Sequence, residues 1–343
     1  MAEAVDVCVV GFGAIGALYA WALERSGKAR VTAVCRSNHD VLHDLGLEFH
    51  SDKLGRTTDG PWRPYRVVRT VEDAADRTYA YILCATKCIP EVLTTPSLLS
   101  PLLPNTTQPE TNSPVTTIVL LQNGVGIEDD LIAYLNATND LDKKVVVVSG
   151  CAWVDTTAVD GGKKITQFGT ERLVLGVHKY SALDGQQELR EFCDALILAG
   201  SDAVPVEDID AARWRKVLWN ASFSTLCTLT RTTVGHVLSL PTGRAELASI
   251  MHEVLAVARA SLSPHSALSL PDTVVQEIIA HENPESVFKP SMLVDLEAGR
   301  PMEVEAIVGG VLKRAKNVGV QVPKLELIYA GLSLIQKELL EKK

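Results

Sequence analysis

A glycine-rich turn between an apolar strand and an apolar helix is the feature that most limits what this chain can fold into. Residues 5–10 are mostly valine, and a stretch rich in alanine and leucine runs from residue 17 to residue 23. The turn between them consists of Gly11, Phe12, Gly13, Ala14, Ile15 and Gly16. A GxGxxG pattern that follows a strand and opens a helix indicates a dinucleotide-binding βαβ unit. A glycine-rich turn that binds no ligand is the alternative.

Each glycine of this turn has its own physical role in such a unit. Gly11 permits the tight turn, Gly13 lets the backbone approach a pyrophosphate, and Gly16 lets the helix pack close to the strand. The N–H groups at the start of the helix are donors for the phosphates. We therefore expect all six residues of the turn to bind a dinucleotide cofactor.

The end of the next predicted strand bears on which dinucleotide binds. The run "RVTAVCR" ends at Arg36, and no acidic residue follows before Asp40. NAD-binding proteins usually place an acid here for the ribose hydroxyls, whereas a guanidinium pairs with the 2′-phosphate of NADP. The sequence therefore predicts NADP(H) as the cofactor, with Arg36 as a ligand of the 2′-phosphate. An exposed arginine at a strand end, without this role, is the plain alternative.

Further strand-like runs at residues 79–87, 116–126 and 144–154 alternate with helical stretches, which predicts a doubly wound parallel sheet. Ligands of such sheets bind at the carboxyl ends of the strands. Lys87 and Asn123 stand at two of these ends, so we expect them to face the cofactor and its substrate. Residues 94–114 are rich in Pro, Thr, Ser and Asn and read as a surface insertion.

The second half of the chain has helical rather than strand periodicity. Apolar residues at helical spacing between residues 304 and 318 form one face, and a second helix is expected over 323–340. A length of 343 residues suggests two domains. The predicted fold class is therefore α/β, with an NADP-binding Rossmann domain over 1–205 and a mostly helical domain over 206–343.

One helix of this second domain carries a lysine among apolar residues. The run "RKVLWNASFSTL", residues 215–226, reads as a helix that is apolar around most of its circumference. Lys216, Asn220 and Ser224 fall on one stripe at spacing i, i+4, i+8. A lysine on a buried helix requires a reason, although a surface lysine that extends its charge into water is the alternative.

With these blocks in place, the chain resembles the ketopantoate reductases and related 2-oxoacid reductases over nearly its whole length. The resemblance rests on blocks that occur in the family's order: "GFGAIG", Arg36, "ATK", "LQNGVG", "RWRKVLWNA" and "SMLVDLEAGRPMEVEAI". This family joins an NADP-binding Rossmann domain to a helical domain and reduces a 2-oxo acid to the 2-hydroxy acid. The resemblance implies ketopantoate as the default substrate.

The same resemblance implies roles for individual residues. Lys216 would be the general acid, and Glu303 the acid near it. Asn220 would bind the substrate, and Ser291 its carboxylate or hydroxyl group. Asn123 would be an active-site amide that also contacts the cofactor, as Glu303 would, and Lys87 would lie on the cofactor side.

The chemistry suits these residue types. Hydride transfer to a carbonyl carbon leaves an alkoxide that needs a proton, and a protonated Lys216 can supply it. A nearby carboxylate such as Glu303 would keep that lysine charged. Plainer readings stay open: acids are common in first helical turns for dipole reasons, and Ser291, which follows Pro290, fits a helix cap.

Two departures from the family pattern concern the substrate. Ser224 stands where the family usually has a second asparagine, and Phe288 where an asparagine is also common. Both changes remove amide groups from positions expected to bind the substrate's distal hydroxyl, and Phe288 adds apolar area. A D-2-hydroxyacid dehydrogenase that acts on a bulkier, apolar 2-oxo acid is therefore the first alternative. A non-catalytic protein that senses NADP(H) is the second.

Composition limits the partners and the compartment. The net charge is −9, and the absence of a Lys/Arg-rich run argues against nucleic acid or an anionic membrane as a partner. Seven cysteines without a CxxC pair suit free thiols and a cytoplasmic protein. His39 and His43 lie near Cys35, but this spacing suits a solvated helix face better than a metal site. A helical second domain also makes a homodimer a possible assembly.

Overall fold

The computed structural model describes residues 4–103, 115–137, 145–178 and 183–341. The chain forms two compact units. The first comprises Met1–Lys87, Thr94–Gln122 and Glu128–Ile209, and the second comprises Cys88–Leu93, Asn123–Ile127 and Asp210–Lys343. The sequence predicted a boundary between the two domains after residue 205 and one continuous segment for each domain. In the structure, two short segments that follow strands of the first unit belong to the second.

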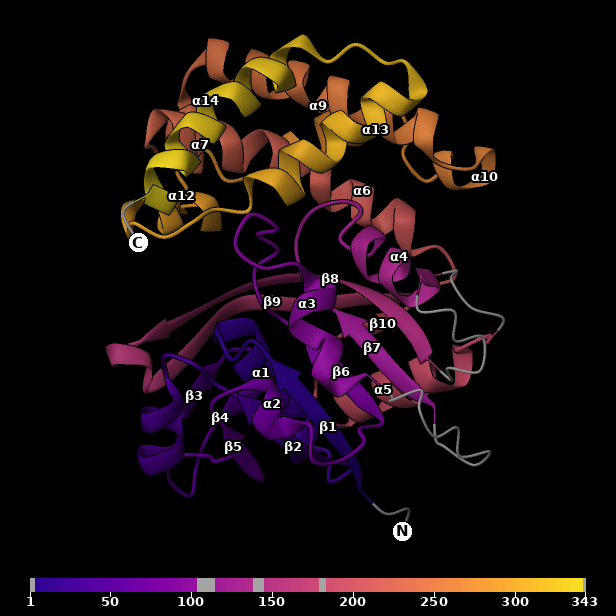
Figure 1. The fold of residues 1–343 in the computed structure, drawn as a ribbon. Coiled ribbons are helices and arrows are strands. Elements are labelled where there is room, and N and C mark those ends of the chain that lie inside the picture. The colour runs from indigo at the N-terminus through magenta and orange to yellow at the C-terminus, as the bar shows by residue number, and fades with distance from the viewer. Residues whose placement is uncertain (1–3, 104–114, 138–144, 179–182, 342–343) are drawn as a thin grey trace. The chain divides into compact units, whose positions relative to one another are not determined.

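A sheet of ten strands, counted over the described residues, forms the centre of the first unit (Figure 1). Its strands run in the order β4-β3-β9-β8-β7-β6-β1-β2-β5, with β10 paired to β9. They are β1 Val5–Val10, β2 Ala29–Val34, β3 Glu48–Ser51, β4 Gly55–Arg56, β5 Arg66–Val68, β6 Tyr81–Cys84, β7 Thr116–Leu120, β8 Val145–Val159, β9 Lys164–Val177 and β10 Ala203–Pro205.

The strands from β8 through β7, β6, β1 and β2 to β5 pair in parallel, which confirms the predicted Rossmann-type sheet. The sheet as a whole is mixed, because β8 and β9 pair in antiparallel fashion. The reason is local. The chain reverses within the short turn Asp160–Gly162, whose residues all have positive φ, and so short a connection joins only antiparallel neighbours.

Helices accompany the strands of this unit. They are α1 Ala14–Arg25, α2 Val71–Ala74, α3 Thr95–Leu99, α4 Asp129–Ala137 and α5 Gln186–Leu198. Helices α1 and α5 pack against each other and against β9, and the fully buried Leu18 and Leu196 lie in the common core. Burial of such a side chain contributes about 1.5–3 kcal/mol.

The predicted surface insertion at 94–114 is only partly described. Its first residues form α3, whose Leu99 is fully buried and whose N-terminus is capped by the Thr94 hydroxyl. This part is therefore a packed helix and not a surface loop, because its apolar residues find room beside α4. Residues 104–114 lie outside the described part of the chain.

The second unit is mostly helical, as predicted. Its long helices are α6 Ile209–Trp219, α9 Pro241–Ser261, α13 Gly310–Val318 and α14 Pro323–Glu341. Shorter ones are α7 Thr225–Thr230, α8 Val234–Ser239, α10 Pro264–Ala267, α11 Val274–His281 and α12 Ser291–Glu297. Helix α9 packs against α8, α11, α13 and α14 and buries Ile250, Met251 and Val254 in their common core.

Two π-helical turns interrupt the predicted helices of this unit. One, η4, spans Asn220–Ser224 between α6 and α7, and the other, η5, spans Glu305–Gly309 before α13. The stretch 215–226 is thus helical throughout, with a wider turn in the middle. Turns of this kind are rare and often occur at functional sites. No helix among the described residues is long and apolar enough to cross a membrane.

Candidate functional site

The glycine turn has the geometry that its spacing predicts. Gly11 has φ +93°, and a Cβ atom there would lie 2.5 Å from the Thr86 backbone nitrogen. A Cβ on Gly16 would lie 2.1 Å from the carbonyl oxygen of Gly11. A Cβ on Gly13 would meet no described atom within 4 Å. Gly11 and Gly16 are therefore required by the fold, whereas the space beside Gly13 is open.

The start of α1 is available for phosphate binding. Gly13 is the N-cap, and no side-chain hydrogen bond caps this helix. Ala14 and Ile15 are partly exposed in its first turn. The Phe12 side chain is buried and stacks on Trp62 at a centroid distance of 6.3 Å, so that residue has only its backbone to offer a cofactor.

The loop after β2 is fastened to the glycine turn by a residue that the sequence analysis missed. The Asn38 side-chain amide donates to the Phe12 carbonyl at 2.8 Å. An asparagine two residues beyond Arg36 is the only sequence signal for this contact. Arg36 itself is exposed at the carboxyl end of β2, just after Cys35, whose N–H donates to the Val68 carbonyl of β5.

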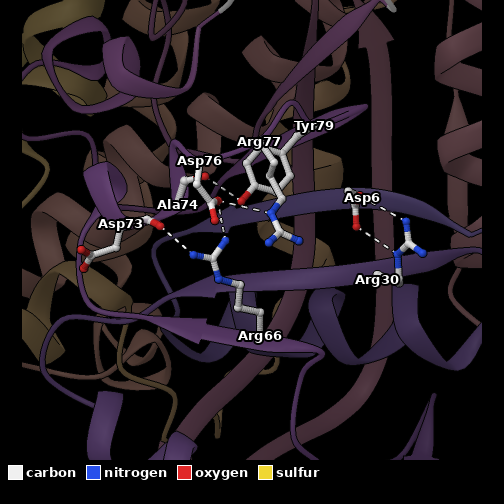
Figure 2. Close-up of polar contacts among 8 residues, drawn as sticks. All are labelled: Asp6, Arg30, Arg66, Asp73, Ala74, Asp76, Arg77 and Tyr79. Atoms are coloured by element: carbon white, nitrogen blue, oxygen red, sulfur yellow. Dashed lines mark hydrogen bonds and ion pairs between the residues drawn. The ribbon is translucent and has the colours of Figure 1, made fainter.

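Other arginines of the same strands are engaged by carboxylates. Figure 2 shows Arg30, near the amino end of β2, paired with Asp6 at 3.0 Å. It also shows Arg66, at the start of β5, bound to Asp76 at 2.6 Å and to the Asp73 carbonyl at 2.8 Å. These contacts stabilise strand starts, at the opposite end of the strands from Arg36.

The considered metal site near Arg36 consists of His39 and His43 together with Cys35. The two imidazole rings stack at a centroid distance of 5.5 Å, and each ring nitrogen Nδ1 lies beside the aspartate that follows it, Asp40 or Asp44. Over the described residues, no group of three or more His, Cys, Asp or Glu side chains is arranged to hold a metal ion.

At the ends of β6 and β7, polar side chains connect the two strands. Lys87 is exposed three residues after β6. Beside it, the Gln122 side-chain amide donates to the Thr86 hydroxyl at 3.3 Å, and the Thr95 hydroxyl donates to Gln122 Oε1 at 3.2 Å. The predicted cofactor residues of the first unit thus lie at the carboxyl ends of its parallel strands.

In the second unit, a buried carboxylate brings together two distant segments. The Glu303 side chain is 5% exposed. Its Oε1 accepts the Cys88 backbone N–H at 3.0 Å, and its Oε2 accepts the Asn123 side-chain amide at 3.2 Å. Two predicted site residues, Asn123 and Glu303, are therefore in direct contact. A position before a helix would by itself leave an acid exposed, so the dipole reading does not account for this burial.

The segment 123–127 is locked in place against the helices of the second unit. Gly124 has φ +104°, and a Cβ there would lie 2.2 Å from the Ala306 carbonyl oxygen. That carbonyl accepts the Val125 N–H at 3.1 Å. The buried Arg213 donates to the Gly124 carbonyl at 3.0 Å. Because Arg213 lies three residues before Lys216 on α6, it ties the Asn123 segment to the lysine's own helix.

The stripe Lys216, Asn220 and Ser224 spans the junction of α6 and η4. Lys216 is half-buried, Asn220 is 8% exposed, and Ser224 is buried. The η4 turn packs against η5, which begins two residues after Glu303, and against α12, which begins at Ser291. The folded helical unit therefore brings together the elements that carry Lys216, Asn220, Ser224 and Ser291, and η5, which follows Glu303.

Phe288 lies in the loop before α12, and Ser291 is the first residue of that helix. The Phe288 ring, 38% exposed, lies 6.2 Å from the Trp219 ring, which stacks on Phe223 at 5.3 Å. Ser291 is exposed at the first position of α12, and no side-chain hydrogen bond caps that helix. The helix-cap reading of Ser291 is therefore wrong, and its hydroxyl is exposed to solvent.

A pair of glycine substitutions separates ligand binding from folding in the turn. We expect Gly13→Ala to change the free energy of unfolding by less than about 1 kcal/mol, because its backbone conformation suits alanine. It should nevertheless raise the Kd for NADPH and NADH by about tenfold or more, since the methyl group occupies the pyrophosphate's space. Gly16→Ala, the matched control, should lower the free energy of unfolding by about 1–3 kcal/mol. Thermal unfolding and fluorescence titration measure both, and normal cofactor affinity in Gly13→Ala would refute the assignment.

Comparison with known proteins identifies one family over most of the chain. Residues 7–180 match the family model described as ketopantoate reductase PanE/ApbA, and residues 208–336 match its C-terminal counterpart. The crystal structure of 2-dehydropantoate 2-reductase from Methylococcus capsulatus is 30% identical, with a TM-score of 0.79 and 98% of each chain covered.

Two more distant structures share the fold. A D-mandelate dehydrogenase solved with NADH and anilino(oxo)acetate is 18% identical, with a TM-score of 0.76 over 97% of this chain and 99% of that one. A dimeric ketopantoate reductase from Staphylococcus aureus is 22% identical, with a TM-score of 0.71 over 98% and 100%. The resemblance seen in the sequence blocks is thereby confirmed: this chain belongs to the ketopantoate reductase family and is an oxidoreductase that acts on CH–OH groups.

Proposed function

We propose that this protein reduces a 2-oxo acid to the 2-hydroxy acid with NADPH, and that ketopantoate is the default substrate. The observation that carries the proposal is the buried Glu303 carboxylate, held by the Asn123 amide and the Cys88 N–H within the unit that also carries Lys216. Burial of a carboxylate costs hydration free energy, and such burial is typical of a site that uses the charge.

The residues divide the reaction between them. A nicotinamide held at the glycine turn would supply the hydride that reduces the substrate carbonyl carbon. Lys216 polarises the carbonyl and gives its proton to the oxygen as negative charge develops there. Glu303, stabilised by its two donors, keeps the lysine charged and oriented. Asn220 and Ser291 hold the substrate, with Ser291 donating to its carboxylate or hydroxyl.

Replacement of the proposed general acid tests the mechanism. Lys216→Ala should lower kcat/KM by about 100-fold to 10,000-fold, because the alkoxide then has no positioned proton donor. The Kd for NADPH should stay as in the wild type. Arg215→Ala is the matched control: this neighbouring cation is half-exposed and pairs with Glu277 at the surface, so its turnover should be normal. Near-normal kcat in folded Lys216→Ala, measured by NADPH absorbance, would contradict the proposal.

The preference for NADPH rests on Arg36, which is exposed at the carboxyl end of β2 where no acid follows before Asp40. Arg36→Ala should raise the Kd for NADPH by about tenfold to 100-fold and leave the Kd for NADH unchanged, since a charged hydrogen bond to the 2′-phosphate is lost. Arg30→Ala is the control, because that arginine occupies the same strand but pairs with Asp6. An unchanged ratio of the two dissociation constants in Arg36→Ala would disprove the role.

A bulkier, apolar 2-oxo acid is the second candidate substrate, and the aromatic contacts favour it. Trp219, Phe223 and Phe288 form a connected set of rings, and two of them immediately precede Asn220 and Ser224 in the sequence. An apolar substituent would gain contact area against the partly exposed Phe288 and Trp219, whereas Phe223 is fully buried and only stacks on Trp219. The distal hydroxyl of ketopantoate would find no amide at position 224 or 288.

A panel of 2-oxo acids decides between these candidates. With NADPH, kcat/KM is measured for ketopantoate and for branched-chain and aromatic 2-oxo acids, in the wild type and in Phe288→Asn. If the rings bind the substituent, aromatic acids are preferred, and Phe288→Asn shifts the preference towards ketopantoate by about tenfold or more. A wild type that prefers ketopantoate would refute this candidate. Intact NADPH binding with no turnover on any acid would favour the non-catalytic sensor.

We also propose a cytoplasmic protein that forms a homodimer. All seven cysteines are free and buried, which suits a reducing compartment. Leu327 and Leu334 are exposed one heptad apart on α14, an apolar feature of the helical unit that a second copy would cover. The dimeric structural neighbour from Staphylococcus aureus is consistent with this assembly.

A further inference from the structure

The stretch that presents Glu303 has no regular structure of its own. Residues 301–303 lie between α12 and the helical turn that begins at Val304, outside any helix or strand. A backbone in this state is not fixed by local hydrogen bonds. Contacts from elsewhere must therefore determine where the Glu303 carboxylate lies.

Gln336 of α14 provides one of these contacts. The Met302 N–H donates to Gln336 Oε1 at 2.8 Å, and Gln336 Nε2 donates to the Met302 carbonyl at 3.0 Å. The amide thus pairs with both polar backbone groups of the residue before Glu303, as a neighbouring strand would. Gln336 is 3% exposed, and without it two buried backbone groups would lose their partner at high cost.

Tyr329 of the same helix holds the other side. Its hydroxyl donates to Glu305 Oε2 at 2.6 Å, and this hydrogen bond, followed by burial, raises the pKa of the tyrosine. Tyr329 and Gln336 are seven residues apart, so they lie on one face of α14. Helix α14 therefore hydrogen-bonds to the chain on both sides of Glu303, at Met302 and at Glu305.

Helix α14 is itself firmly anchored. The Glu253 carboxylate of α9 accepts the N–H groups of Lys324 and Leu325 at 3.1 and 3.0 Å, which caps the start of α14. Leu325 and Leu332 are fully buried in the core of the unit. A helix fixed at its start and along its buried face is a rigid support for the two contacts.

We propose that Gln336 and Tyr329 are positioning residues that aim the Glu303 carboxylate for the reaction. The proposal rests on the proposed role of Glu303 and adds two residues that touch neither substrate nor cofactor. Gln336 holds the backbone of Met302 and Tyr329 holds the side chain of Glu305, while the Cys88 N–H and the Asn123 amide hold the carboxylate itself. Displacement of a catalytic group by a fraction of an ångström is enough to slow a reaction strongly.

Single substitutions at the two positions are the first test. Gln336→Glu keeps an acceptor for the Met302 N–H but loses the donor, Gln336→Leu loses both, and Tyr329→Phe removes only a hydroxyl. We expect kcat for the best 2-oxo acid to fall about tenfold in Gln336→Glu and Tyr329→Phe, and further in Gln336→Leu. Lys337→Ala, at the exposed Lys337–Glu341 pair of the same helix, should leave kcat unchanged. Circular dichroism and thermal unfolding establish that each variant is folded.

The decisive comparison repeats the substitutions in a Glu303→Gln background. If the two residues act through Glu303, Tyr329→Phe and Gln336→Glu should lower kcat less than about twofold there, because the aimed charge is already gone. Equal losses in both backgrounds, or no loss with Glu303 intact, would overturn the proposal. Normal kcat in Glu303→Gln alone would overturn it as well, by removing the role of Glu303, whereas the Lys216→Ala result tests the general acid separately.

Discussion

A carboxylate can be buried only where donors compensate for its lost hydration, and in this protein that requirement organises the second unit. Glu303 takes its donors from Cys88 and Asn123, which precede it by 215 and 180 residues. Both donors lie in short segments that leave the sheet region of the sequence and fold with the helices. The helical unit is therefore incomplete without residues that follow strands β6 and β7. Glu303 is thus one of the contacts that join these segments to the helices, together with those of Arg213 and Ala306 to residues 124 and 125.

The glycine turn illustrates how folding and ligand binding share one motif. Two of its glycines are needed because backbone atoms approach them within about van der Waals contact, and the third borders empty space. Gly13 has neither a positive φ nor a crowding neighbour, so neither backbone strain nor packing requires a glycine there, which supports the proposed approach of a ligand. The same reasoning distinguishes Gly124, which the Ala306 carbonyl crowds and which serves to place Asn123.

The sequence predicted the parts of the fold that depend on local patterns. The strand, turn and helix around Gly11–Gly16 and the apolar face that begins at residue 304 follow from spacing alone. The structure confirms the first, and it confirms the face as far as Ala315, whereas Val318 at its predicted end is exposed. The reversal of β9 depends on a single short turn, Asp160–Gly162, whose Asp-Gly pair is a hairpin signal that the sequence analysis missed. The segments 88–93 and 123–127 are too short for any periodicity, so their place among the helices was not predictable. Asn38, Arg213 and Gln336 escaped notice because their contacts reach backbone groups distant in sequence, and such contacts leave no trace in a local pattern.

The junction of α6 and η4 carries residues that bear on both the reaction and the substrate of this protein. Its polar residues Lys216 and Asn220 suit the reduction of a 2-oxo acid, a chemistry that needs a proton donor and a hydrogen-bonding amide. Its aromatic residues bear on what else the substrate carries. Trp219 directly precedes Asn220, and Phe223 directly precedes Ser224. The π-helical turn η4, which holds Asn220, Phe223 and Ser224, contacts both α12 and η5. Phe288 is partly exposed and contacts Trp219. An apolar group would gain contact area against such rings and a hydroxyl would find no partner in them, which is the reason to test apolar 2-oxo acids beside ketopantoate.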